Sequence, residues 1–155
     1  MGRYELSHGR TGVHRHRHRA VHHHQRSVLM RILMCGSRTL EDDARFDVIG
    51  TVVEGLATNY PGTHVFCHGG AAGADTWAGD AAEALGFQVI VYKADWKTHG
   101  KAAGPIRNQR MLTEFKPDLV VAFVDKPLEY SRGTNHMVSI ARKAGVDTIV
   151  VEVMR

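Results

Sequence analysis

The chain has 155 residues, a length typical of one domain that buries its own core. Its 43% hydrophobic and 23% charged residues are ordinary for a globular protein, and no apolar run approaches the roughly 18 residues of a membrane span, so we expect no membrane partner. The net charge of +4 lies in residues 1–29, with six arginines and one glutamate, whereas residues 30–155 hold 14 Lys and Arg against 15 Asp and Glu. A nearly neutral folded part argues against a broad nucleic-acid-binding face.

Residues 1–29 also hold seven of the eleven histidines, and His and Arg alternate from His14 to Arg19 without apolar periodicity. Three interpretations stay open: a disordered low-complexity extension, a segment added by a translation start upstream of Met30, and a transition-metal site in a His-rich tract. We therefore divide the chain into this disordered extension and one folded domain, residues 30–155.

From Met30 onward, short apolar runs alternate with segments of helical periodicity. We predict strands at 30–35, 63–68, 87–92, 118–124 and 146–153, helices at 41–58, 74–85, 105–115 and 133–144, and a polar loop at 93–104. The strands are nearly continuously apolar, as strands buried on both faces are. The alternation predicts a single α/β domain whose doubly wound, mainly parallel sheet has the strand order 3-2-1-4-5 and helices on both faces.

The two cysteines, Cys35 and Cys67, fall inside predicted strands, where free cysteine behaves as a small apolar residue. Because this is no disulfide framework, we expect a reducing environment and a cytoplasmic location.

Four polar turns follow predicted strand ends, and each leads into a helix. They are residues 36–39 (GSRT), 68–75 (HGGAAGAD), 104–108 (GPIRN) and 131–134 (SRGT). Ligands of open α/β sheets bind at the carboxyl ends of the strands, and helix starts present unpaired N–H groups that suit an anion. With Arg38, Arg107 and Arg132 among them, the turns predict a site for a phosphate-bearing small molecule.

Each turn taken singly has a structural alternative. Residues 36–39 are equally typical of a strand–helix turn capped by Thr39. Residues 69–73 lack the Gly-x-Gly-x-x-Gly spacing of dinucleotide folds and the lysine of a P-loop. Trp96 suits packing as well as stacking on a base, and Asn108 suits fixing a loop as well as reading a ribose hydroxyl.

Taken together, the four turns and the loop residues Ala94-Asp95-Trp96 and 99–105 resemble the YspA-like branch of the SLOG superfamily, a bacterial and phage group. The resemblance covers Met30 to about Val153. It implies a Rossmann-like fold and a nucleotide-derived ligand, and its relatives include cytokinin-activating phosphoribohydrolases and the DNA-uptake protein DprA. Members of this superfamily commonly dimerise, so the resemblance also implies a homodimer.

The hydrolases of this superfamily share a Gly-Gly-x-Gly-Thr-x-x-Glu motif and an Arg-Lys pair. Arg107 matches the arginine and Asn108 replaces the lysine, but the glutamate position falls on Met137. Losing a positioned acid or base typically costs on the order of 10²–10⁴ in rate. Asp75 is the substitute carboxylate, and its structural alternative is to cap the following helix or to hold Arg107 or Arg132.

We therefore expect a module that binds or senses a nucleotide-derived ligand. Two alternatives stay open: a phosphoribohydrolase or N-glycosidase acting on nucleoside monophosphates, with Arg107 and Asp75 as catalytic residues, and DprA-like binding of single-stranded DNA. The expected ligand-binding residues are Gly36, Ser37, Arg38, Gly69, Gly70, Ala71, Gly73, Ala74, Asp75, Trp96, Lys101, Arg107, Asn108, Ser131, Arg132, Gly133 and Thr134. The backbone N–H groups of residues 69–73 and 133–134 would hold phosphate oxygens. We expect neither a metal ion nor a resident cofactor.

Overall fold

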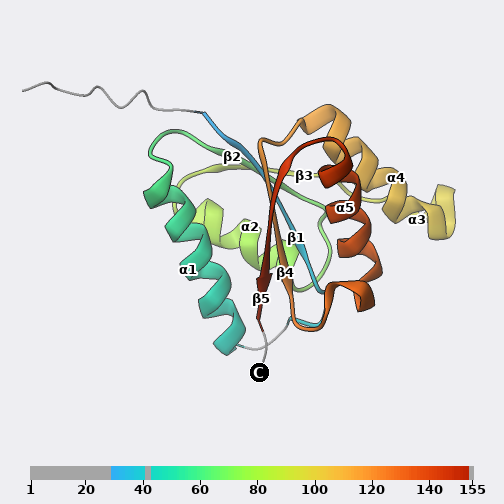
Figure 1. Ribbon diagram of the computed structural model, residues 1–155, viewed down its shortest axis with the longest axis horizontal. Helices are drawn as coiled ribbons and strands as arrows, with labels where there is room; N and C mark the ends of the chain where they lie inside the picture. Colours follow the sequence, from blue (N-terminus) through green and yellow to red (C-terminus); the bar gives the residue numbers. More distant parts are fainter. Residues whose placement is uncertain (1–28, 41–42, 154–155) are drawn as a thin grey trace, which may run out of the picture.

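Five parallel strands form one sheet in the order β3-β2-β1-β4-β5 (Figure 1). The structure, a computed structural model, describes residues 29–40 and 43–153, so the expectations for the N-terminal extension lie outside the described residues. The strands are β1 (Arg31–Gly36), β2 (Val65–His68), β3 (Gln88–Val91), β4 (Leu119–Val124) and β5 (Asp147–Glu152). The Rossmann-like fold class and the predicted strand order are confirmed.

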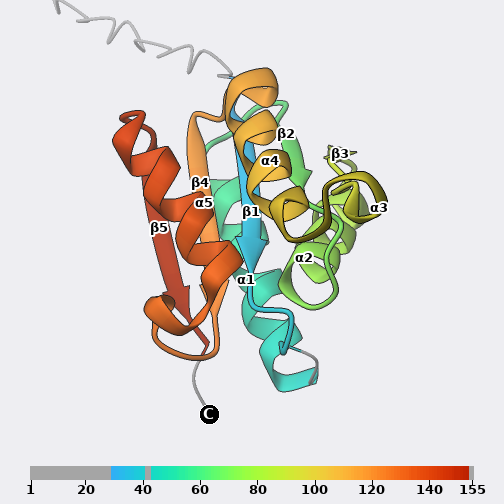
Figure 2. The ribbon, with the colours of Figure 1, turned by 90° about the vertical axis from the view of Figure 1, so that its right-hand side faces the viewer.

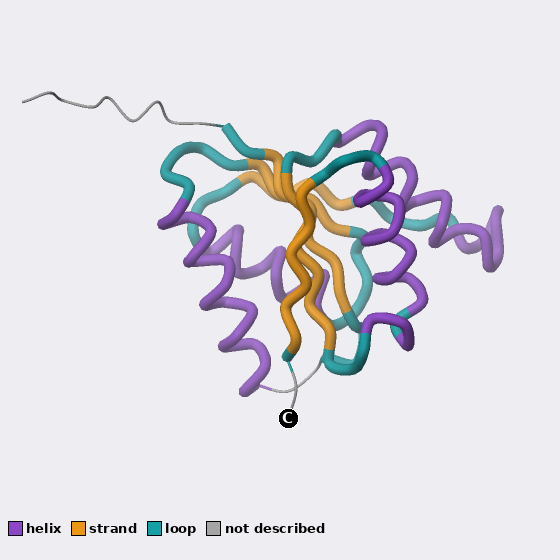
Figure 3. The backbone as a smooth tube through the Cα atoms, viewed as in Figure 1, coloured by secondary structure: helices purple, strands orange, loops and turns teal. Residues whose placement is uncertain are grey.

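Helices cover both faces of the sheet (Figures 1 and 3). The helices α1 (Asp43–Asn59) and α2 (Ala74–Ala84) lie against one face, and α4 (Ala103–Arg110) and α5 (Arg132–Lys143) lie against the other (Figure 2). None of the helices in the described residues combines the length and the apolar character needed to cross a bilayer.

Strand β1 shows why the interior of a buried parallel strand is apolar on both faces. Ile32 and Met34 join the core cluster under α1 and α2, whereas Leu33 and Cys35 join the cluster under α5. Each such side chain contributes about 1.5–3 kcal/mol when fully buried. The edge strands β3 and β5 are only partly buried, so the prediction of strands buried on both faces holds for the centre of the sheet and is wrong at its edges.

The predicted polar loop at 93–104 contains a short helix, α3 (Trp96–His99), followed by a 3₁₀ turn, Gly100–Ala102. The Asp95 side chain caps α3 by accepting from the backbone N–H of Thr98 at 3.0 Å. A helix of one turn is too short to show the helical periodicity of apolar residues, so α3 was not predicted from the sequence. Helix α4 begins at Ala103 and continues into a π-helical turn, Met111–Phe115, before ending at Lys116.

The topology brings the ends of β1 and β4 together at the centre of the sheet. The two strands are neighbours, with Gly36 paired to Phe123, and the chain leaves them toward opposite faces. The arrowheads of β1 and β5 in Figure 2 point the same way, toward the edge where the polar turns emerge. This is the switch point at which open α/β sheets bind ligands.

Candidate ligand-binding site at the carboxyl edge

Three adjoining cavities lie at this edge, and Arg38 lines all of them. The serine cavity, about 290 Å³, is lined by Ser37, Arg38, Thr39, Lys126, Tyr130, Ser131, Arg132 and Gly133. The tryptophan cavity, about 400 Å³, is lined by Arg38, Trp96, Lys101, Gly104, Pro105, Arg107, Asn108, Arg132, Gly133 and His136. The glycine cavity, about 290 Å³, is lined by Arg38, Gly69, Gly70, Ala71, Lys93, Ala94, Trp96 and Arg107. We call the three together the arginine groove.

The three predicted arginines reach this groove from three different elements. Arg38 follows β1, Arg107 lies on α4, and Arg132 is the first residue of α5. The Arg38 guanidinium lies 5.5 Å from the centre of the Trp96 ring, a cation–π contact. No carboxylate of the described residues lines the groove, so its wall carries only positive charge.

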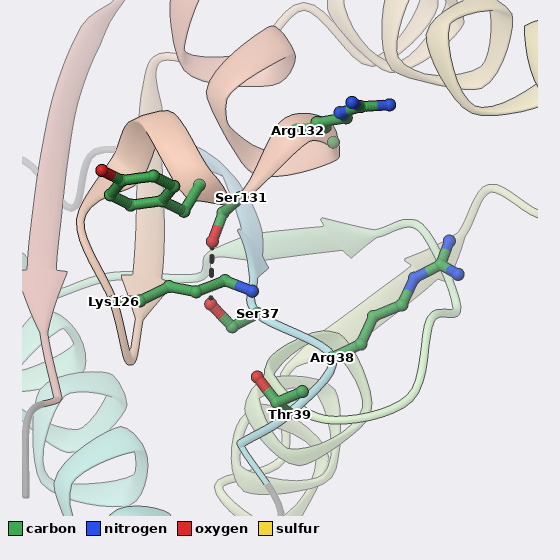
Figure 4. A pocket seen from close by; sticks show the side chains of 8 residues that line it. Ser37, Arg38, Thr39, Lys126, Ser131 and Arg132 are labelled. Atoms are coloured by element: carbon green, nitrogen blue, oxygen red, sulfur yellow. Dashed lines mark hydrogen bonds between the residues drawn. The ribbon is translucent and has the colours of Figure 1, made fainter.

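The first turn of α5 opens on the serine cavity. Ser131 is the N-cap residue, but its side chain does not cap the helix; its Oγ lies 3.3 Å from the Oγ of Ser37 (Figure 4). Among the described residues no side chain caps this turn, and Arg132 and Lys126 stand beside it. Unpaired N–H groups and the positive end of the helix dipole therefore face a cationic cavity, which suits an anion.

The glycine-rich turn after β2 is already occupied by the protein's own carboxylate. Asp75 Oδ2 accepts from the backbone N–H groups of Gly69 at 2.9 Å and Ala71 at 3.4 Å, and the N–H of Gly70 donates to His68 Nδ1 at 3.0 Å. We expected these N–H groups to hold phosphate oxygens. The structure gives the N–H groups of residues 69–71 protein partners instead.

Asp75 is 4% exposed and lies in the first turn of α2. Burial raises its pKa to about 6, while the hydrogen bond from Ala71 and the charge of Arg107 act in the opposite direction. It lines none of the three cavities. Asp75 therefore holds the glycine-rich turn before α2, a role that the sequence analysis did not predict.

Arg107 and Asn108 connect the glycine-rich turn to α5. The Arg107 guanidinium donates to the carbonyl oxygen of Gly69 and, through Nε, to Asn108 Oδ1 at 3.0 Å. Asn108 Nδ2 in turn donates to the carbonyl oxygen of Gly133 at 3.1 Å. Burial lowers the pKa of Arg107, and Asp75 opposes this shift. Helix α4 therefore fixes the relative position of the two turns.

Five predicted site residues do not line the groove: Gly36, Gly73, Ala74, Asp75 and Thr134. Gly73, with φ of 78°, packs on the turn after β1, because a Cβ there would lie 2.5 Å from the carbonyl oxygen of Ser37. Ala74 belongs to the core under α1 and α2. Met137, at the glutamate position of the hydrolases, is fully buried in the other core cluster.

Eight residues that line the groove are absent from the predicted ligand-binding set. Five of them lie in the predicted turns and loop (Thr39, Lys93, Ala94, Gly104 and Pro105), and three do not (Lys126, Tyr130 and His136). Lys93 and Lys126 follow β3 and β4, so the strand-end rule that found the other residues applies to them as well. His136 lies four residues after Arg132 on α5, and this spacing places both on one helical face.

A five-stranded parallel sheet with helices on both faces defines a Rossmann-like α/β domain. Within this class, the chain belongs to the YspA, cpYpsA-related SLOG family, whose family model matches residues 30–99. It is also similar to the Gene 61 protein of Mycobacterium phage D29, with 37% identity over 129 residues that cover 78% of this chain and 95% of that protein. The family resemblance stated from the sequence is confirmed.

Two solved structures share the fold. DNA processing protein A (DprA) from Streptococcus pneumoniae matches 79% of this chain with a TM-score of 0.61 and 18% identity. The chain spans half the length of that protein. The Moco Carrier Protein from Chlamydomonas reinhardtii matches with a TM-score of 0.58 and 18% identity, over 83% of this chain and 78% of that one.

Proposed function

We propose that residues 30–155 bind a nucleotide or nucleotide-derived ligand, with its phosphate in the serine cavity and the remainder along the arginine groove. The observation that carries this proposal is the uncapped start of α5, which faces a cavity lined by Arg38, Lys126 and Arg132. Cations surround this helix start, and no described carboxylate lines the cavity to neutralise them.

The energetics of such a site favour a phosphate. A hydrogen bond that involves a charged group contributes about 1.5–3 kcal/mol, and a helix start adds about 0.3–1 kcal/mol for an anion. Arginine can contact two phosphate oxygens at once. Cavities of about 290 and 400 Å³ that share Arg132 and Gly133 are together in the size range of small-molecule sites.

We propose that the ligand is bound and not cleaved, because no described carboxylate lines the groove. Glycosidic cleavage needs a positioned acid or base near the bond that breaks. Met137 is buried in the core, and Asp75 is held by the N–H groups of Gly69 and Ala71 outside the three cavities. The hydrolase alternative therefore has no described carboxylate in the groove to carry the reaction.

Binding of single-stranded DNA has less support than binding of a small ligand. Residues 30–155 hold 14 Lys and Arg against 15 Asp and Glu, so this part of the chain has no net positive charge to displace the counterions of a long strand. The likeness to DprA at 18% identity is a likeness of fold.

The proposal also includes a cytoplasmic location and a homodimer. The location is supported by Cys35 and Cys67, which are buried free thiols, as a reducing compartment allows. The homodimer follows from the family resemblance alone and stays a prediction.

Calorimetric titration with nucleoside monophosphates, ribose 5-phosphate and orthophosphate tests the function. Arg132→Gln should weaken binding of every phosphate-bearing probe by about 10- to 150-fold, the equivalent of a lost charge-assisted hydrogen bond. Arg142→Gln is the matched control, because Arg142 is exposed in the last turn of the same helix. Failure of all these probes to bind the wild type, or equal losses in the two variants, would contradict the proposal.

A further inference from the structure

We propose that His136 recognises the base of the ligand by donating its Nε2–H to an acceptor atom of the heterocycle in the tryptophan cavity. This inference rests on the proposed function and names the part of the groove that distinguishes a nucleotide from a sugar phosphate. His136 was not among the residues predicted from the sequence.

The hydrogen bonds of Asn108 fix the orientation of its side-chain amide. The Nε–H of Arg107 can only donate, so the atom that it meets at 3.0 Å is the amide oxygen. The carbonyl oxygen of Gly133 can only accept, so the atom 3.1 Å from it is the amide nitrogen. Both assignments agree, and Asn108 is 4% exposed, so water has little access to replace either partner.

The orientation of Asn108 in turn determines the tautomer of His136. The same amide nitrogen lies 3.1 Å from His136 Nδ1, and its second N–H is available for that contact. Nδ1 therefore accepts, and in a neutral imidazole the proton then sits on Nε2. Among the described residues no hydrogen-bond partner occupies Nε2, so the ring carries a donor that the protein itself does not use.

The surroundings of His136 suit a flat heterocycle. The ring is half-buried and lines the tryptophan cavity together with Trp96, Gly104 and Pro105. Trp96 is 49% exposed, so part of its surface stays accessible although Arg38 lies over the ring. Apolar and aromatic walls with one oriented donor are the usual means of selecting a base.

The position of His136 on α5 also matches the proposed phosphate site. It lies one turn after Arg132, roughly 6 Å farther along the helix axis and on the same face. A ligand with its phosphate at the start of α5 would therefore extend past Arg132 toward the imidazole. The geometry assigns the two ends of one nucleotide to two side chains of one helix.

Binding measurements with paired variants test this assignment. His136→Leu removes the donor, and His136→Gln keeps an N–H donor on a flexible side chain. We expect His136→Leu to weaken binding of the tightest nucleoside monophosphate up to about tenfold more than binding of ribose 5-phosphate, the value of a neutral hydrogen bond. His136→Gln should recover most of this difference. Equal losses for the two probes, or no loss, would overturn the inference.

A spectroscopic measurement separates recognition from a structural role. Nitrogen NMR of the wild type should show His136 protonated on Nε2 and not on Nδ1. In Asn108→Asp the carboxylate can only accept, so the proton should move to Nδ1 and the preference for nucleotide over ribose 5-phosphate should fall. If that variant does not fold, the wild-type spectrum still tests the inference, since a proton on Nδ1 of His136 would overturn it.

The two proposals fail in distinguishable ways. Failure of the wild type to bind any phosphate-bearing probe would overturn the proposed function and this inference together, whereas binding that is insensitive to His136→Leu would overturn the inference alone.

Discussion

The Asp75 carboxylate accepts a hydrogen bond from the backbone N–H of Gly69 at 2.9 Å, and the Arg107 guanidinium donates to the carbonyl oxygen of the same glycine. Both polar groups of Gly69 are thus held by charged side chains from α2 and α4. The glycine-rich turn that we expected to hold phosphate oxygens is therefore held by a carboxylate of the protein itself. These contacts use the N–H of Gly69 within the protein, and the start of α5, which faces the serine cavity, has no side-chain cap among the described residues.

The buried carboxylate makes stability depend on pH in a defined direction. Burial raises the pKa of Asp75 to about 6, whereas an unfolded Asp titrates near 3.9. The folded state therefore binds the proton more tightly, and the contribution of Asp75 to stability is fully present below about pH 4 and lost as the pH rises through 6. A pKa difference of about 2 corresponds to about 3 kcal/mol.

Chemical denaturation of the wild type and Asp75→Asn at several pH values measures this contribution. The free energy of unfolding of the wild type, minus that of the variant, should fall between about pH 4 and pH 6 and then stay constant. A difference that grows with rising pH would contradict the burial of this carboxylate.

Gly36 is required by packing at the end of β1. A Cβ there would overlap the carbonyl oxygen of Phe123 and lie 2.5 Å from the Cβ of Ala74. We expect Gly36→Ala to lower the free energy of unfolding by about 1–3 kcal/mol. Gly50→Ala in α1 is the matched control, since a Cβ there meets nothing within 4 Å, and it should raise stability by about 0.5–1 kcal/mol. Equal effects of the two substitutions in urea denaturation would refute this packing argument.

Met137 should not tolerate the glutamate that the related hydrolases carry at the corresponding position. Its side chain is fully buried in the cluster that contains Leu33 and Val120. Met137→Glu would bury an unpaired charge, and we expect it to destabilise the fold by more than about 3 kcal/mol without producing free base from nucleotides. Met137→Leu conserves volume and should cost less than about 1.5 kcal/mol. Thermal denaturation compares the two variants, and a stable Glu variant that releases base would restore the hydrolase alternative.

The arginines of residues 1–29 should account for any affinity of the chain for single-stranded DNA. Six arginines could release enough counterions to weaken binding roughly 300-fold from about 50 to about 200 mM salt. We expect fluorescence anisotropy with a labelled oligonucleotide to show this steep salt dependence for the full chain and to lose it when residues 1–29 are deleted. A shortened chain that keeps the affinity would place a DNA-binding face on the folded domain.

The sheet could be predicted from the sequence because the central strands carry nearly continuous apolar runs. Continuous runs such as 30–35 and 118–124 are typical of strands covered on both faces, and turns at their carboxyl ends follow from parallel topology. The same rule brought Arg38 and Arg132 to one groove. The prediction of a strand-end turn at 104–108 is wrong, because these residues lie inside α4, and Arg107 reaches the groove from that helix.

The partners of the glycine-rich turn could not be predicted in the same way. Asp75 accepts from the N–H groups of Gly69 and Ala71 in its own turn, and no sequence pattern specifies whether this side chain faces the turn or a ligand. His136 was missed because a single histidine on a helix has no signal until Asn108 is seen to bind its Nδ1.

Mass spectrometry of the small molecules that the purified protein retains after incubation with a metabolite extract tests the central claim most directly. The wild type should retain an intact, phosphate-bearing nucleotide derivative, and Arg132→Gln should retain much less of it. Enrichment of a compound without phosphate, equal retention by the two proteins, or no enrichment at all would contradict the assignment of the arginine groove.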